Sequence, residues 1–195
     1  MSFTDLARFL LTRCELVIND KVCLLAEIEM YGWTQEHPDG YADKHPLQAT
    51  TGNFHFARAG KSPTSAYKSG TYKRVDFCFG REGFYLGVLL RSLQTPDEGL
   101  IEGPCRCVNY ILKSYNVDKI DDLVLPTEVL PFTSNKHNFV LREAQPRTVE
   151  LLCGPRIGLN SEKCPPFHQV PYRFVVSMKG TSVKKERSKL SPLPM

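Results

Sequence analysis

Hydrophobic and polar positions alternate most regularly between Leu24 and Tyr31, which predicts a β-strand. The even-numbered residues of this stretch are apolar and suit a core, whereas the opposite face carries Glu27 and Glu29. Side chains two residues apart on a strand lie about 6.5–7 Å apart. The two carboxylates would therefore interact, and partial burial would raise the pKa of at least one of them, as a general base near neutrality requires. The alternative is an edge strand with a solvated polar face.

The same patterns predict the elements on either side. Ser2 and Asp5 have the form of a capping box, and apolar residues recur at helical spacing, so we expect a short helix over 4–12. Asn19-Asp20 is a hairpin turn signal between strands over 15–18 and 22–31. The most apolar run, 84–93, should be a central strand, and Pro104 should begin a helix that ends near Tyr115.

The remaining chain is less regular. Residues 54–56, 72–79, 149–153 and 172–176 are expected to be strands, the last of them closing the fold. Residues 117–124 are short and acidic, and 126–146 are low in periodicity and expected to be irregular. Residues 179–195 lose all periodicity and are rich in lysine. We therefore expect one domain over 1–178 and a disordered basic tail over 179–195.

Composition fits a soluble protein of one domain. The chain has 195 residues, of which 42% are hydrophobic and 24% charged, and no apolar run approaches the roughly 20 residues that span a bilayer. The N-terminus does not have the form of a signal peptide. The net charge of +4 permits a polyanionic partner without requiring one. Seven cysteines without zinc-like spacing indicate reduced thiols in a nuclear or cytoplasmic protein.

Three places carry candidate chemistry besides the two carboxylates. Arg91 interrupts the central strand, and a buried cation needs a partner, for which Glu29 is the candidate. The loop over 32–52 could wall a pocket with its histidines, although these could equally be surface residues, and the spacing of His37, Asp39 and His45 is not diagnostic of a metal site.

A basic segment interleaved with aromatic residues precedes the strand over 72–79. Lys68, Lys73 and Arg74 suit contacts with phosphates, and Tyr72 suits a wedge between bases. The alternative is a solvated basic loop.

Several blocks together resemble the alkyladenine (3-methyladenine) DNA glycosylase family of base excision repair. They follow one another in family order over residues 6–176: Leu6–Leu11, Leu16-Val17, Glu27–Tyr31 (EIEMY), Leu89–Leu93 (LLRSL), Gly103-Pro104, Arg156–Leu159 (RIGL) and Pro171–Phe174 (PYRF). The resemblance implies a single-domain α+β fold with a mixed, largely antiparallel, curved β-sheet and a few short helices. That fold is also similar to the C-terminal domain of methionyl-tRNA formyltransferases.

Roles carried over by the resemblance concern the strand that was described first. Glu29 would match the general base that activates water, and Arg91 the arginine that holds this water and the base. Tyr31 would stack on a flipped-out base. His45 would be the histidine of the pocket, with His37 competing for that role.

This sequence departs from the family in its pocket. The family has an asparagine shortly before the central strand, where an ungapped count places Cys78, with Asp76 nearby. Tyr72 is the candidate for the intercalating tyrosine. The resemblance therefore implies a divergent member with an altered substrate pocket.

The function that follows is a DNA glycosylase-like hydrolase that excises an alkylated or deaminated purine by base flipping and attack of water on the N-glycosidic bond. We expect double-stranded DNA as the partner, a monomer, and neither a metal nor another cofactor. Two alternatives stay open: a non-catalytic nucleic-acid-binding or interaction module on the same fold, and a hydrolase of N-glycosides other than DNA.

Overall fold

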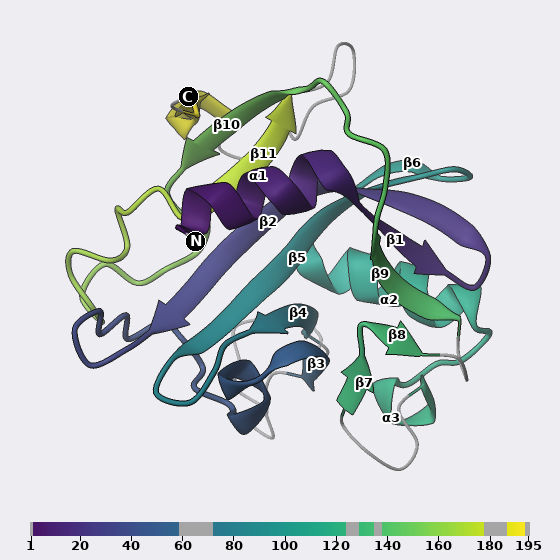
Figure 1. Ribbon diagram of the computed structural model, residues 1–195, viewed down its shortest axis with the longest axis horizontal. Coiled ribbons are helices and arrows are strands. Elements are labelled where there is room, and N and C mark those ends of the chain that lie inside the picture. Colours follow the sequence, from purple (N-terminus) through teal and green to yellow (C-terminus); the bar gives the residue numbers. More distant parts are fainter. Residues whose placement is uncertain (1, 59–71, 124–128, 135–137, 178–186, 194–195) are drawn as a thin grey trace.

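The computed structural model describes residues 2–58, 72–123, 129–134, 138–177 and 187–193 (Figure 1). Its elements follow in chain order: α1 (Phe3–Arg13), β1 (Cys14–Ile18), β2 (Lys21–Trp33), η1 (Pro46–Ala49), β3 (Thr51–Arg58), β4 (Lys73–Phe79), β5 (Tyr85–Thr95), β6 (Gly99–Glu102), α2 (Pro104–Ser114), α3 (Ile120–Leu123), β7 (Val129–Pro131), β8 (Thr133–Ser134), β9 (Phe139–Glu143), β10 (Glu150–Gly154), β11 (Arg173–Ser177), η2 (Arg187–Lys189) and β12 (Ser191–Pro192). None of the helices within these ranges is long and apolar enough to cross a membrane.

The strands form one sheet in the order β12-β10-β11-β2-β5-β4-β3-β7, with β1, β6, β8 and β9 attached beside this path. Every pairing between the described strands is antiparallel, so the parallel pairs that a mixed sheet would contain are not among them. The expectation of a single-domain α+β protein with a largely antiparallel sheet is confirmed. β2 lies between β11 and β5 and also pairs with β1, so the alternative of a solvated edge strand is wrong.

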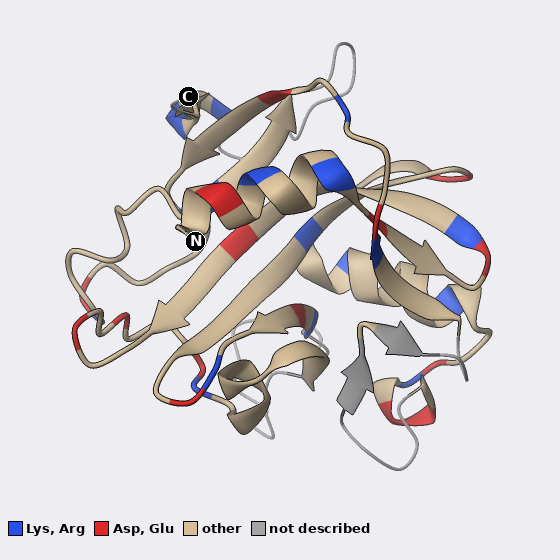
Figure 2. Cartoon of the chain, in the orientation of Figure 1, with Lys and Arg blue, Asp and Glu red and all other residues tan. Residues whose placement is uncertain are grey.

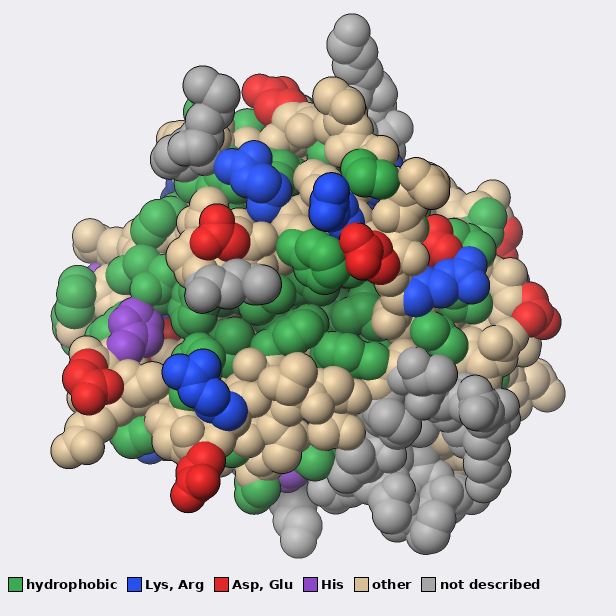
Figure 3. Space-filling model, viewed as in Figure 1, with side chains coloured by type: hydrophobic (Ala, Val, Ile, Leu, Met, Phe, Trp, Pro, Cys, Tyr) green, Lys and Arg blue, Asp and Glu red, His purple; other side chains and the backbone are tan. Residues whose placement is uncertain are grey.

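One face of the central strands packs under α1. Ile28 and Met30 of β2 are fully buried beside Leu90 and Val88, their partners on β5. A Cβ added to Gly32 would overlap the ring of Phe3, so the helix lies directly on the strand at this point. Figure 3 shows hydrophobic side chains gathered beside α1 across the middle of this face. By the alternation of a strand, Glu27 and Glu29 point to the other side.

The alternation along β2 is less regular than the sequence suggested. The register with β5 shifts between Leu25 and Glu27 and again between Glu27 and Ile28. A bulge reverses the side to which the preceding residues point. As a result Leu25, and not Leu24, belongs to the core, while Leu24 is half-buried.

The predicted helix starts and the predicted hairpin turn are confirmed. The capping box between Ser2 and Asp5 is formed, and α1 extends one residue beyond the expected helix at each end. Asn19 and Asp20 adopt positive φ angles of 45° and 69°, as a tight two-residue hairpin requires. Gly103, with a φ of 106°, precedes Pro104 at the start of α2.

Two expectations about the C-terminal half are wrong. The region 126–146 contains β7, β8 and β9, and β9 pairs with β1 along its full length. Within the expected disordered tail, residues 187–193 are ordered, because η2 and β12 return to β10. A Cβ at Gly154 would overlap the carbonyl oxygen of Lys189, so the missing side chain permits this approach.

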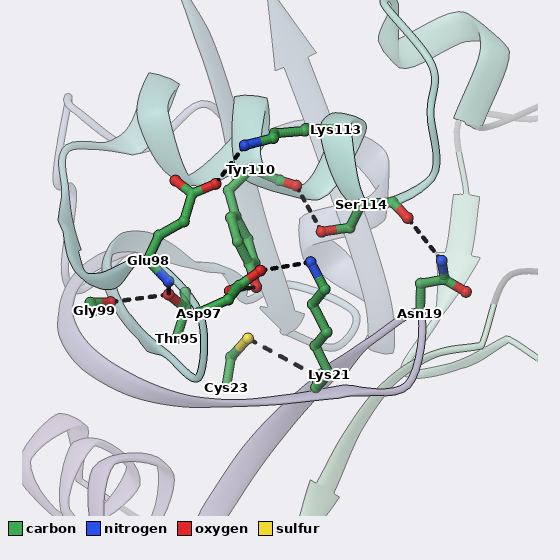
Figure 4. Close-up of polar contacts among 10 residues, drawn as sticks. All are labelled: Asn19, Lys21, Cys23, Thr95, Asp97, Glu98, Gly99, Tyr110, Lys113 and Ser114. Carbon is green, nitrogen blue, oxygen red and sulfur yellow. Dashed lines mark hydrogen bonds and ion pairs between the residues drawn. The ribbon is translucent and has the colours of Figure 1, made fainter.

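A surface cluster ties the tip of the β1–β2 hairpin and the β5–β6 turn to α2 (Figure 4). Asp97 Oδ2 lies 2.7 Å from Lys21 Nζ, and Asp97 Oδ1 accepts a hydrogen bond of 2.7 Å from the hydroxyl of Tyr110. Asn19 Nδ2 donates to the carbonyl oxygen of Ser114 at 2.7 Å. The hydrogen bonds from Lys21 and Tyr110 lower the pKa of Asp97 from 3.8 to about 2.

We predict that Asp97→Asn lowers the thermal melting temperature at neutral pH. A depressed carboxyl pKa stabilises the fold above the unfolded value and loses this effect as the pH falls through the folded value. The difference from wild type should therefore be full above pH 3.8 and disappear as the pH approaches about 2. Circular dichroism melts across this range measure it. Asp118→Asn, at an exposed position, is the control, and an equal effect of both variants would contradict the role of the cluster.

Candidate active site

Charged side chains meet in the middle of β2 and β5. Figure 2 shows an acidic segment of β2 beside a basic segment of β5. Arg91 Nη1 lies 3.3 Å from Glu29 Oε1, and Arg91 Nε donates to Glu27 Oε1 at 3.1 Å. Glu29 is 0% exposed, Glu27 2% and Arg91 7%. The expected pairing of Arg91 with Glu29 is therefore formed, and the same guanidinium also bridges to Glu27.

Glu27 has as many side-chain and backbone partners as Glu29, but two of its three partners are guanidinium groups. Its Oε1 also accepts from Arg173 Nε of β11 at 2.6 Å, and its Oε2 accepts from the hydroxyl of Ser92 at 2.7 Å. Two guanidinium groups thus compensate this buried carboxylate. Glu27 therefore holds both arginines in place. The sequence did not reveal this role, because Arg173 lies 146 residues away along the chain.

The carboxylate of Glu29 is bound by three different groups. Tyr31 donates its hydroxyl to Oε2 at 2.8 Å, the backbone N–H of Ile157 donates to Oε1 at 2.8 Å, and Arg91 supplies the ion pair. A carboxylate offers about four lone-pair positions, which leaves room for a further donor. Burial raises the pKa of Glu29 against the opposing effects of these three groups, and the charge of Glu27 raises it further.

Tyr31 contacts two charged groups, Arg156 through its ring and Glu29 through its hydroxyl. The guanidinium of Arg156 lies over this ring, 4.5 Å from its centroid. A base stacked on Tyr31 would therefore have to use the other face of the ring. Burial and the neighbouring Glu29 raise the pKa of the Tyr31 hydroxyl well above its usual value, so it stays a donor to the carboxylate.

Arg156 fastens the loop after β10 to the loop after β2. Its Nη1 donates to the carbonyl oxygen of Met30 at 2.9 Å and to Asp39 Oδ2 at 2.6 Å, and its Nη2 donates to the carbonyl oxygen of Phe167 at 3.0 Å. Asp39 and the side chain of Arg156 are fully buried. This pair fixes the backbone that places the N–H of Ile157 on Glu29.

The two candidate histidines lie in different surroundings. His37 sits among the rings of Phe3, Phe167 and Tyr172, on the α1 side of the sheet. His45 stacks on His55 at a centroid distance of 4.0 Å. No group of three metal-ligating side chains occurs in the part of the chain that is described, so His37, Asp39 and His45 do not form such a group.

The polar face continues from β2 across the neighbouring strands. Leu89 pairs with both Glu29 and Asp76, and Asp76 pairs with His55. Paired residues of adjacent strands point to the same face, so Asp76 lies on the side of Glu29, two strands away.

Cys78 lies on the same face as Asp76, two residues further along β4. It is fully buried and pairs with Gly87. Burial raises the pKa of its thiol to about 12, so Cys78 contributes an uncharged thiol to this face of the sheet.

The residues expected to bind DNA make contacts within the protein. Lys73 Nζ donates to Asn109 Oδ1 of α2 at 3.0 Å, and Arg74 pairs with Asp43. Tyr72 directly precedes β4 and is half-buried. Lys68 lies outside the described residues. To bind the phosphates of DNA, Lys73 and Arg74 would therefore have to give up these partners within the protein.

Comparisons with known proteins identify a relative that matches almost the whole chain. No family model matches the sequence. The chain is 36% identical over 206 residues to the protein named "Uncharacterized protein L759" of Acanthamoeba polyphaga mimivirus, and the match spans 98% of this chain and 92% of that protein. The similarity therefore extends over the whole domain, including the strands that carry the buried charges.

We predict that Asp39→Asn destabilises the protein by about 3 kcal/mol, because it leaves the buried guanidinium of Arg156 without its counter-charge. Chemical denaturation measures the free energy of unfolding. Asp43→Asn, in the same loop, is the matched control. Its carboxylate is about half exposed, so its loss should cost less than about 1 kcal/mol. Equal losses in the two variants would show that the buried pair does not hold these loops.

Proposed function

The chain belongs to the same protein family as the mimivirus protein L759, and from the chemistry of its buried charges we propose that it is a DNA glycosylase-like hydrolase. The substrate would be an alkylated or deaminated purine, excised by base flipping and by attack of water on the N-glycosidic bond. The observation that carries this proposal is the 3.3 Å contact between Arg91 Nη1 and Glu29 Oε1. A carboxylate with a raised pKa next to a fixed cation suits a general base that works on water.

In this mechanism the protein first rotates the nucleotide out of the duplex, at a cost of a few kcal/mol. Tyr72 would fill the vacated stack, and Lys68, Lys73 and Arg74 would hold phosphates. The base would lie against Tyr31 on the ring face that Arg156 does not cover.

Glu29 would then take a proton from water while this water attacks the anomeric carbon and the N-glycosidic bond breaks, with the bonding electron pair going to the nitrogen of the departing purine. Arg91 orients the water and the carboxylate. One carboxylate that acts through water fits a single displacement without a covalent intermediate. Positively charged alkylated bases leave readily, whereas neutral bases need an acid.

Burial decides how the substrate would approach. Glu29 is fully buried, whereas Arg91 keeps a small exposed fraction and Tyr31 is half-buried. The flipped base would reach the carboxylate past these two side chains. In such a water-poor site the charges of Glu29 and Arg91 interact more strongly than they would in bulk water.

The finer architecture belongs to the same proposal. An N-terminal helix, a hairpin and a central charged strand pair occur in the order that the resemblance to alkyladenine glycosylases implies. We propose that the chain shares this fold, works on double-stranded DNA as a monomer, and acts in the nucleus or cytoplasm. Its pocket wall, with Cys78 and Asp76, differs from the family pattern and would select a different base.

A second candidate is a non-catalytic nucleic-acid-binding module on the same fold. The complete burial of Glu29, with three groups bound to it, favours this reading, because the same contacts would also serve stability alone. The variants below separate the two candidates.

We predict that Glu29→Gln lowers the rate of abasic-site formation by about 10²–10⁴-fold, since a glutamine cannot accept the proton of water. The assay is alkali-induced strand cleavage of duplexes that carry alkylated or deaminated purines. Glu36→Gln, at an exposed position of the following loop, is the control. An unchanged rate in Glu29→Gln rejects the assignment of Glu29 as the general base. If the wild type has no activity and binds DNA with or without a lesion equally well, the non-catalytic module is favoured.

The pH profile tests Arg91 separately. The positive charge of Arg91 lowers the pKa of Glu29, so Arg91→Gln should raise this pKa further. Because the base must be ionised, the acidic limb of kcat/KM should move to higher pH in Arg91→Gln and stay near its wild-type position in Arg91→Lys. A limb that does not move in Arg91→Gln would mean that Glu29 is not the group that titrates.

A further inference from the structure

The short helix η1 is fixed on the polar face of the sheet by two glycines. A Cβ added to Gly80 would overlap the backbone oxygen of Gln48, and one added to Gly87 would overlap its side-chain amide. Gly87 pairs with Tyr31 on one side and with Cys78 on the other. The amide of Gln48 therefore lies directly on the sheet, at the position between Tyr31 and Cys78.

This amide is oriented by Asp76. Gln48 Nε2 donates to Asp76 Oδ2 at 3.1 Å, and the two side chains are nearly inaccessible, with Gln48 1% and Asp76 4% exposed. Among the described residues, Gln48 Oε1 has no hydrogen-bond partner. A buried acceptor without a partner is costly to the fold, and a ligand that donates a hydrogen bond to it would remove this cost.

Two further polar atoms beside Asp76 are in the same condition. His55 Nδ1 lies 3.6 Å and Arg74 Nε 3.5 Å from Asp76 Oδ2, and within the described part of the chain neither has a hydrogen-bond partner. The site therefore combines a carboxylate and an amide oxygen, which accept, with a guanidinium N–H, which donates.

We propose that Gln48 and Asp76 read the hydrogen-bonding edge of a guanine-type ring. Guanine offers an N–H and an adjacent amino group, which match the two acceptors, and next to them a carbonyl oxygen, which matches the N–H of Arg74. Hypoxanthine lacks the amino group, and adenine presents an acceptor in place of the ring N–H. A site that is built to bind donors rejects analogues without them, because its own polar groups would then stay unpaired.

This inference rests on the proposed function only in so far as the ring would enter on the face of Glu29. Leu89 pairs with both Glu29 and Asp76, so the hydrogen-bond acceptors of Asp76 and Gln48 lie on the same face as Glu29, the proposed general base, and Asp76 is two strands away from it. Guanine could come from a flipped-out nucleotide or from a free nucleotide, and the recognition chemistry is the same.

The test measures binding and needs no catalysis. Isothermal titration calorimetry with 9-methylguanine, 9-methylhypoxanthine and 9-methyladenine should show that wild type binds 9-methylguanine at least tenfold more tightly than the other two. Asp76→Asn should reduce this preference to less than threefold, and Gln48→Met should weaken it as well. Gln35→Met, at an exposed position, should leave it unchanged. Circular dichroism checks folding, and if Asp76→Asn does not fold, Gln48→Met decides.

Fluorescence anisotropy separates the two sources of the ring. Duplexes with a mismatched guanine or a mismatched adenine are compared with and without guanosine monophosphate as competitor. Equal affinity for the three methylated bases, or no measurable binding of any of them, overturns the inference. Guanine-selective binding without abasic-site formation would leave the inference intact and reject the proposed activity. Abasic-site formation without selectivity would do the reverse.

Discussion

The burial of two carboxylates in the middle of the sheet is the constraint on which the rest of the structure depends. Glu27 and Glu29 point to the same side of β2, and both are almost inaccessible to solvent. Isolated charges would not be tolerated there. Arg91 contacts both carboxylates, and Arg173 supplies a second guanidinium to Glu27. The strands that bring these arginines, β5 and β11, are thus the ones that flank β2 at its two carboxylates.

The same buried charges also position the loops that follow β2 and β10. Glu29 takes a hydrogen bond from the backbone of Ile157, and the adjacent Arg156 is locked to Asp39 and to the carbonyl oxygen of Met30. The loop after β10 and the loop after β2 are thereby held over the end of β2. A group with a raised pKa is therefore surrounded by rigid partners, which is the arrangement that general-base chemistry needs.

The sequence revealed what depends on neighbours along the chain. The capping box at Ser2, the turn at Asn19-Asp20 and the strand from Leu24 follow from local rules, and the need of Arg91 for a carboxylate follows from its apolar strand. Contacts across long separations could not be read in this way. Arg156 meets Asp39 over 117 residues. The strands β9 and β12 are short and weakly patterned, and they form because β1 and β10 offer them edges to pair with. The orientation of Gln48 likewise depends on two distant glycines.

The central claim is that the burial of Glu29 keeps its pKa above that of an ordinary glutamate although Arg91 is in contact with it. Carbon-13 NMR of protein labelled at the glutamate carboxyl carbons measures this value directly. The account predicts one resonance that titrates above the range of the exposed glutamates and is missing from the spectrum of Glu29→Gln. If the resonance that disappears in this variant titrates at or below that range, the carboxylate is held as a permanent structural anion, and the account is contradicted.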